Sequence, residues 1–298
     1  MIKQVIAKTL RHLLKLTPKA TIYSPPLAQD EQAIELTYLG TAGFIIKSPQ
    51  RTVVLDPYLS RIGLTELLRP LHTNTALLKK YIPKADEVLI GHAHYDHILD
   101  APDLCKQTGA RLIGSRATCM VGRAAGLPES QLVETEGREN IACGAWTVRG
   151  LPSIHGKAIM GRIPIAGDIL SPPVWPPKML DLKHGLVLNW LVDTGQLTIV
   201  HIDSADFIPE ELKGVQADVV CLCAIGRKYR PNYVKEVVEL LRPKWIVPCH
   251  WDTMFTPFEQ EPDYIPSVDL AGFVQEIKEA GVEPIVMPMR GKQWFKRA

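Results

Sequence analysis

The stretch VLIGHAHYDH, residues 88–97, joins a short apolar run to a dense group of side chains of the types that bind metal ions. The apolar run is typical of a buried strand, and the carboxyl end of such a strand borders the crevice where α/β proteins bind ligands. His92 and His94 are two residues apart in an extended segment, so they point the same way and can hold one cation. Asp96 and His97 lie where the chain turns and can face a second cation. Three of the nine histidines and an aspartate fall within six residues, an arrangement expected by chance in fewer than about one such sequence in a hundred, which favours a metal site over exposed loop histidines.

Four residues do not complete two catalytic metal sites, because each metal normally keeps about three protein ligands and a water. His155 follows one β-rich run and precedes a glycine, and His250 ends another run. Asp203 ends the run that begins at residue 197, and its two carboxylate oxygens can bridge two metals. Each of these residues alone is a weak signal, since a histidine at a strand end is more often structural than a ligand. Their shared position at strand ends supports a common site.

Two kinds of hydrophobic period alternate around this segment and indicate an α/β fold. In each half of the chain, β-rich runs come first and an alternation of strand and helix patterns follows. This order predicts two sheets packed face to face with helices outside, a four-layer αββα sandwich. We expect strands over residues 34–39, 44–46, 52–55, 87–90, 111–114, 131–133, 146–151, 186–192, 197–202, 218–225, 245–248 and 284–287, and helices over residues 76–81, 101–108, 117–125, 232–241 and 268–280. A proline-rich segment over residues 163–182 matches neither period and is expected to be a long loop, either a binding wall or an inert surface excursion.

Length and composition indicate a single globular domain over residues 31–298 with a lead-in over residues 1–30. Hydrophobic residues make up 46% and charged residues 22% of the chain, which excludes a disordered protein. The formal net charge of +2 argues against a long nucleic acid as the partner. The six cysteines form no C-x-x-C pair and are expected to be free thiols. No apolar run is long enough to span a bilayer and no signal peptide is evident, so we expect a soluble cytoplasmic protein.

Residues 1–16 place apolar side chains at helical spacing, with four basic residues among them. A basic amphipathic helix of this kind can lie on an anionic membrane surface. The alternative is a helix that packs on its own domain or on a second copy of the chain. The pattern leaves the oligomeric state open.

The ligand-type residues and the β/α order resemble the metallo-β-lactamase superfamily over about residues 34–289. The motifs LGTAGF at residues 39–44 and VLDPY at residues 54–58 are similar to the opening strands of one branch of that superfamily. This branch contains L-ascorbate-6-phosphate lactonase and N-acyl-phosphatidylethanolamine phospholipase D. Residues 225–233 and 243–253, the latter ending in HWDT, resemble the closing region of the same branch.

The resemblance implies a role for each residue of the cluster. The first metal would be held by His92, His94 and His155, the second by Asp96, His97 and His250, with Asp203 bridging the two metals. Asp56 would orient the site from outside it. The histidine at position 94 favours zinc, because the redox diiron relatives carry a glutamate there, and manganese or iron are the alternatives. Ile202 stands where the superfamily usually has glycine, so Asp206 is kept as an alternative bridging residue.

With two divalent metals in place, a bridging water would lose a proton near neutral pH and attack the substrate as hydroxide. Asp96 is expected to accept or relay that proton in addition to binding metal. Arg227, Lys228 and Arg230 follow the β-rich run over residues 218–225. They would bind an anionic group of the substrate, or else form a solvated basic loop.

Three functions are compatible with these residues. The leading one is hydrolysis of a small anionic ester or lactone, which the branch resemblance and the basic loop support. The alternative is a phosphodiesterase acting on a phospholipid or, less favoured, on nucleic acid. A non-catalytic metal-binding protein is the least favoured, because the ligand set for two metals is complete.

Overall fold

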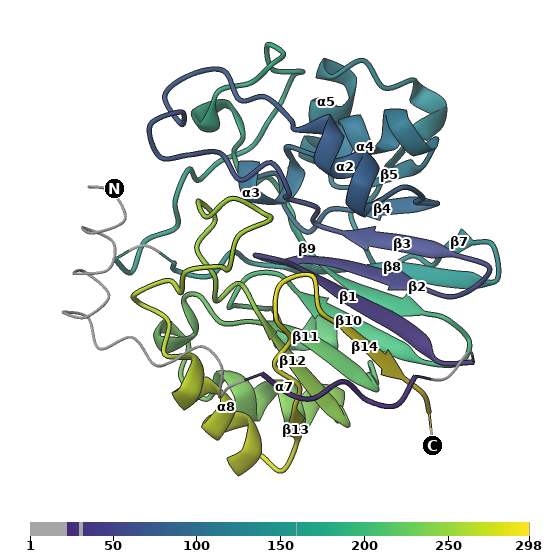
Figure 1. Cartoon of the computed structure of the whole chain (residues 1–298), viewed down its shortest axis with the longest axis vertical. Coiled ribbons are helices and arrows are strands. Elements are labelled where there is room, and N and C mark those ends of the chain that lie inside the picture. The colour runs from purple at the N-terminus through teal and green to yellow at the C-terminus, as the bar shows by residue number, and fades with distance from the viewer. Residues whose placement is uncertain (1–22, 30–31, 159, 298) are drawn as a thin grey trace.

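Two seven-stranded sheets lie at the centre of the computed structural model, which describes residues 23–29, 32–158 and 160–297 (Figure 1). The first sheet has the order β14-β1-β2-β3-β4-β5-β6, and the second has the order β13-β12-β11-β10-β9-β8-β7. The strands of the first sheet are β1 (Ile34–Gly40), β2 (Gly43–Lys47), β3 (Thr52–Leu55), β4 (Glu87–Leu89), β5 (Arg111–Gly114), β6 (Leu132–Glu134) and β14 (Lys292–Phe295). The strands of the second sheet are β7 (Ile141–Cys143), β8 (Trp146–Ser153), β9 (Val187–Asp193), β10 (Thr198–Ile202), β11 (Val219–Cys223), β12 (Trp245–Cys249) and β13 (Glu283–Pro284).

Each sheet has an antiparallel half and a parallel half. In the first sheet β14, β1, β2 and β3 pair antiparallel, and β3 to β6 pair parallel. In the second sheet β7 to β10 pair antiparallel, and β10 to β13 pair parallel. Parallel neighbours need a crossover connection, which is why helices appear only in the later part of each half of the chain. The α-helices are α2 (Thr75–Tyr81), α3 (Tyr95–Ile98), α4 (Ala101–Thr108), α5 (Arg116–Ala124), α6 (Pro209–Leu212), α7 (Tyr233–Leu241) and α8 (Leu270–Glu279), and short 3-10 turns are η2 (Glu129–Gln131), η3 (Met179–Asp181) and η4 (Arg227–Tyr229).

The side chains of β3 show how the layers are built. Val53 and Leu55 point into the hydrophobic core between the two sheets, where they meet residues of the second sheet such as Trp190. Val54, between them, points into a second core beneath α2, α4 and α5. Helices α7 and α8 cover the outer face of the second sheet (Figure 1). The predicted four-layer αββα sandwich is therefore confirmed.

The main departures from the predicted elements are short strands. The sequence did not predict β7 or β14, which are three and four residues long. Strand β14 lies at the end of the chain but pairs with β1, with Ile34 opposite Phe295, so it completes the first sheet. The strand predicted over residues 284–287 is wrong in extent, because β13 pairs with β12 only at Glu283 and Pro284.

The basic amphipathic segment predicted over residues 1–16 lies outside the described residues. Among the helices that the structure does describe, none is long and apolar enough to cross a membrane.

Candidate metal centre

Seven ligand-type residues from distant parts of the chain meet at one end of the sandwich. Each follows the carboxyl end of a strand: the histidine-rich stretch follows β4, and the other residues follow β8, β10 and β12. All seven are buried. Three overlapping groups have one ligand atom of each member within 4.8 Å of the others, namely His92, His94 and His155, then His92, His97 and Asp203, and then Asp96, His97 and His250. Asp203 thus lies between the two sets of residues expected to hold the two metals.

A change of backbone conformation inside the histidine-rich stretch makes this arrangement possible. His94 is extended, with φ −66° and ψ 152°, and it is the N-cap of α3. His92 Nε2 and His94 Nδ1 converge to 3.0 Å. From Tyr95 the chain is helical, which turns Asp96 and His97 toward His250, whose Nε2 lies 3.3 Å from Asp96 Oδ2.

Outer partners hold the imidazoles in defined orientations. His97 Nδ1 lies 2.9 Å from Asp56 Oδ2, and the other oxygen of Asp56 accepts the Gly91 N–H at 2.8 Å. His155 Nδ1 is hydrogen-bonded to the carbonyl of Gly156 at 2.7 Å, which leaves its Nε2 for a cation. The structure therefore places Asp56 where the resemblance implied, behind a ligand-type histidine.

The alternative bridging residue, Asp206, is not part of the cluster. Its carboxylate forms an ion pair with Arg230. Asp203 Oδ2, in contrast, lies 2.5 Å from His92 Nδ1 and 3.7 Å from His97 Nδ1. Of the two aspartates, the geometry brings only Asp203 to the centre.

The electrostatics of the cluster divide its histidines into two kinds. Burial lowers the pKa of His94 to about 3 and that of His155 to about 4, and burial with the neighbouring imidazoles holds the pKa of His92 well below its ordinary value. These three imidazoles are neutral near pH 7, as metal ligands must be. Burial would also lower the pKa of His97, but the carboxylates of Asp56 and Asp96 outweigh it and raise that pKa to about 9. A bound cation would take the place of the His97 proton among these carboxylates.

The donor set fits divalent metal ions. Imidazole and carboxylate groups suit zinc, manganese and iron. Two buried polar atoms in the cluster, Asp203 Oδ1 and His250 Nδ1, have no hydrogen-bond partner among the described residues. Buried polar atoms rarely lack hydrogen-bond partners. Bound metal ions would supply partners for these two atoms.

Gly91 offers a test of the bridging position, because a side chain there would strike Asp203. A Cβ at Gly91 would lie 2.2 Å from Asp203 Oδ2, and Gly91 does not have the positive φ that would itself disfavour alanine. We expect Gly91→Ala to displace the carboxylate and lower metal affinity at least about tenfold, measured by calorimetric titration of the metal-free protein. Gly63→Ala is the control, since the nearest atom to a Cβ there is the carboxylate end of the Glu66 side chain at 3.3 Å. Unchanged affinity in Gly91→Ala would remove Asp203 from the site.

The structure adds two histidines that the sequence did not single out. His201, on β10, is fully buried, and its Nδ1 lies 4.0 Å from Asp56 Oδ2. His184 follows the proline-rich segment by two residues, and its ring centroid lies 5.8 Å from that of His94 and 5.7 Å from that of His155. The carbonyl of His184 accepts the Ala93 N–H at 2.9 Å, so this loop is fastened to the histidine-rich stretch. No local sequence pattern predicts that either histidine lies near the metal centre, because the packing of the sheets brings both of them there.

The metal centre opens into a cavity of about 730 Å³. The proline-rich loop supplies part of the cavity wall through Pro164, Ile165 and Met179. Among the three basic residues predicted to bind substrate, only Lys228 lines this cavity.

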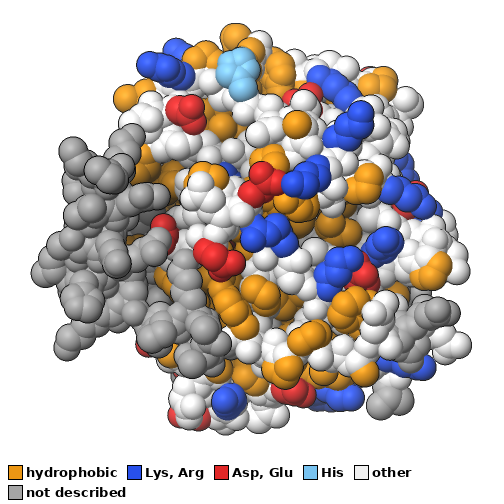
Figure 2. Space-filling view, viewed as in Figure 1, with side chains coloured by type: hydrophobic (Ala, Val, Ile, Leu, Met, Phe, Trp, Pro, Cys, Tyr) orange, Lys and Arg blue, Asp and Glu red, His pale blue; other side chains and the backbone are white. Residues whose placement is uncertain are grey.

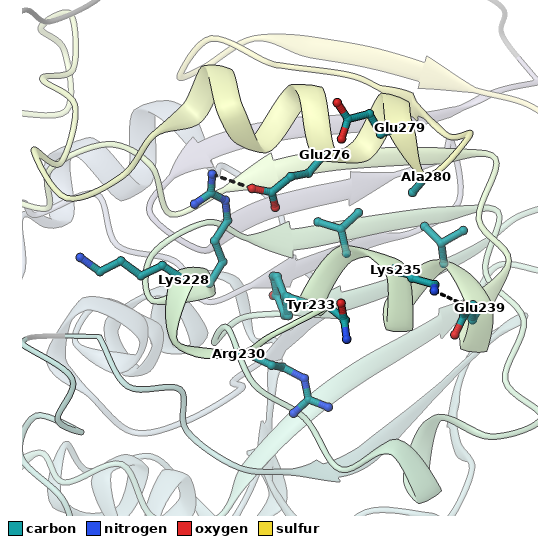
Figure 3. A pocket seen from close by; sticks show the side chains of 12 residues that line it. Lys228, Arg230, Tyr233, Lys235, Glu239, Glu276, Glu279 and Ala280 are labelled. Carbon is teal, nitrogen blue, oxygen red and sulfur yellow. Dashed lines mark ion pairs between the residues drawn. The ribbon is translucent and has the colours of Figure 1, made fainter.

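The prediction for Arg227 and Arg230 therefore needs correction. Arg227 pairs with Glu276 of α8 at 3.2 Å, and Arg230 pairs with Asp206 and, at 2.6 Å, with Glu236 of α7. Both line a groove beside α7 and α8, in which Figure 3 shows Glu276 in an ion pair, and Lys228 lies where this groove meets the cavity. These ion pairs join the segment around η4 to α7, to α8 and to Asp206, and a sequence pattern does not show such long-range partners.

The chain is similar to known proteins in its sequence and in its fold. Residues 35–250 match the sequence model of a family described as the beta-lactamase superfamily domain. A UPF0173 metal-dependent hydrolase of Thermodesulfovibrio yellowstonii is 30% identical over 237 residues, which cover 74% of this chain and 79% of that protein. A second one, from Methanopyrus kandleri, is 25% identical over 272 residues, covering 89% of this chain and all of the relative (100%). The solved structure of Igni18, a metallo hydrolase from Ignicoccus hospitalis, has a similar fold, with a TM-score of 0.60 at 19% identity, covering 90% of this chain and 100% of that one.

Proposed function

The chain belongs to the beta-lactamase superfamily and to its UPF0173 metal-dependent hydrolases, and from this premise we propose that it hydrolyses a carboxylic ester or lactone with two divalent metal ions, zinc being favoured. One observation carries the proposal. The seven ligand-type residues form three overlapping groups at the floor of a single cavity, so two neighbouring cations can face one substrate.

Two bound divalent cations would supply a nucleophilic water near neutral pH and polarise the carbonyl oxygen under attack. His92, His94 and His155 would hold one cation, Asp96, His97 and His250 the other, with Asp203 between them. Burial by itself would raise the pKa of Asp96, but His97 and His250 lower it overall, so this carboxylate is ionised. With the metals bound, the ionised Asp96 would accept a hydrogen bond from the attacking water and orient it. The carboxylate of Asp56 is hydrogen-bonded to Nδ1 of His97 and fixes the orientation of that imidazole ring.

A carbonyl compound fits the cavity better than a phosphodiester. Charge on a transferring phosphoryl group is usually stabilised by Arg, Lys or Mg²⁺ clamps. Apart from the cluster histidines, the cavity wall in the described part of the chain carries one cationic side chain, Lys228. In Figure 2 the Lys and Arg side chains lie mainly over the centre and right of the face, with acidic and apolar side chains between them.

A direct comparison of model substrates tests the proposal. We expect the metal-loaded protein to hydrolyse p-nitrophenyl acetate and γ-butyrolactone with kcat/KM at least about tenfold above that for bis(p-nitrophenyl) phosphate. The opposite preference would favour the phosphodiesterase. Failure on all three substrates and on p-nitrophenyl octanoate by protein that holds two metals would overturn ester hydrolysis for this site.

Lys228 allows the anionic character of the substrate to be tested. Lys228 is exposed, lines the cavity, and has its Nζ 5.1 Å from the centre of the Tyr229 ring. We expect Lys228→Met to lower kcat/KM about two- to fivefold for an ester that carries a free carboxylate, and to leave a neutral ester unaffected, because exposed charge contacts are weak. Lys235→Met is the matched control, since Lys235 pairs with Glu239 at 3.8 Å and lies in the groove of Figure 3, away from the cavity. An equal change in kcat/KM for both esters would show that Lys228 does not bind the carboxylate of the substrate.

A further inference from the structure

The wall of the metal cavity is built mainly from apolar side chains. They come from segments far apart in the sequence, and they surround the polar floor formed by the ligand-type residues. Six of them are Leu67, Met179, Ile225, Met254, Phe255 and Ile265. None of these six is fully buried, so each keeps surface that is not packed against the protein.

The apolar surface continues to the mouth of the cavity. Met160 lines the cavity and is 90% exposed, and Tyr229 lines it and is 37% exposed. Contiguous exposed apolar surface is uncommon on a soluble protein and usually marks a binding site. The volume of about 730 Å³ is in the range of pockets that enclose a whole small ligand, and it is far larger than an acetyl group needs.

We propose that the substrate is an ester with a medium-length hydrocarbon group that lies along this apolar wall while the carbonyl lies over the metal centre. The inference rests on the proposed ester hydrolysis and adds the chemical class of the substrate. A small polar ester would leave the apolar wall in contact with water. A hydrocarbon group removes that wall from water, and each methylene buried there contributes to binding.

The wall also accounts for the position of Met254 and Phe255. They follow His250 by four and five residues, so the segment that supplies a ligand-type histidine also supplies the wall. The Tyr95 hydroxyl lies 2.9 Å from Met254 Sδ, which joins this segment to the first turn of α3 beside Asp96. Hydrocarbon and scissile bond are thereby placed by neighbouring parts of one short segment.

The chain-length dependence of hydrolysis tests the inference. We expect kcat/KM of the metal-loaded protein to rise at least about tenfold from p-nitrophenyl butyrate to the octanoate, since complete burial would give up to about fourfold for each added methylene. A flat or falling series in a protein that hydrolyses the butyrate would overturn the inference and leave ester hydrolysis standing. Absence of hydrolysis across the series would instead overturn the proposed function.

Binding without turnover provides the second measurement. We expect octan-1-ol to bind at least about tenfold more tightly than butan-1-ol in calorimetric titrations, and this result does not depend on hydrolysis. Phe255→Asp should remove the difference, whereas Phe255→Leu should retain most of it and show that the fold tolerates change at this position. Val174→Asp is the matched control, because Val174 is 81% exposed and is not among the residues that line the cavity. Equal binding of the two alcohols, or a preference that survives in Phe255→Asp, would overturn the inference.

Discussion

Replacement of His97 by alanine is expected to lower kcat/KM for ester hydrolysis by more than about a hundredfold, because loss of an outer partner of a metal ligand alone costs about 10- to 100-fold. His97 belongs to two of the three ligand groups, and it is the residue that Asp56 holds. Its removal leaves the carboxylates of Asp56, Asp96 and Asp203 without the imidazole that lies among them. We therefore also expect the metal content of the purified variant to fall from about two ions per chain to one or fewer.

Metal content by mass spectrometry and initial rates on one ester measure these two effects. His72→Ala is a suitable control, since His72 is exposed and lies outside the cluster. A His97→Ala protein that keeps two ions and full activity would show that the cluster is not the catalytic centre. Loss of one ion with retained activity would show that a single metal is sufficient.

Replacement of Asp252 by alanine is expected to lower the free energy of unfolding by about 3–5 kcal/mol, because it leaves a buried guanidinium without its partner. Arg61 Nη1 and Asp252 Oδ2 are 2.7 Å apart, and both side chains are fully buried. Asp252 also accepts the Tyr38 hydroxyl at 2.6 Å and the Thr41 N–H at 2.8 Å. No side chain other than a carboxylate can satisfy this set of donors.

The same network positions the metal centre. Thr41 accepts the His250 N–H through its carbonyl at 2.6 Å, and His250 has a positive φ of 54° that neighbouring contacts must maintain. Asp252→Ala should therefore weaken metal binding as well as stability. Urea unfolding of the metal-loaded protein and metal titration measure the two effects separately.

An exposed ion pair provides the comparison for Asp252. Glu239 pairs with Lys235 across one turn of α7, and both side chains are more than half exposed, at 63% and 72%. Glu239→Ala should change the free energy of unfolding by less than about 0.5 kcal/mol. A loss below about 1 kcal/mol in Asp252→Ala would mean that the buried pair is not needed for stability.

Most of the secondary structure could be predicted because it depends on local periods. The helix over residues 101–108 and the strand over residues 111–114 have the bounds that their patterns predicted. Strand β14 could not be predicted, since four residues at an edge carry little periodicity and acquire their structure by pairing with β1.

The motifs LGTAGF and HWDT show a second level of information. The sequence shows that they resemble a family, but it does not show why they occur together. In the structure Thr41 of the first motif and Asp252 of the second are hydrogen-bonded across 211 positions of the chain. The two motifs thus occur together because their residues are in contact in the folded structure.

The sequence by itself determined the layered α/β fold and the candidate metal ligands, because hydrophobic periods and ligand-type residues at strand ends are recorded locally. Only the tertiary structure brought Asp203 and not Asp206 into the cluster, engaged Arg227 and Arg230 in ion pairs, and surrounded the centre with an apolar wall. Each of these outcomes depends on distances between side chains that are remote in the chain. Such distances are set by how the two sheets and their helices pack, and no local pattern encodes them.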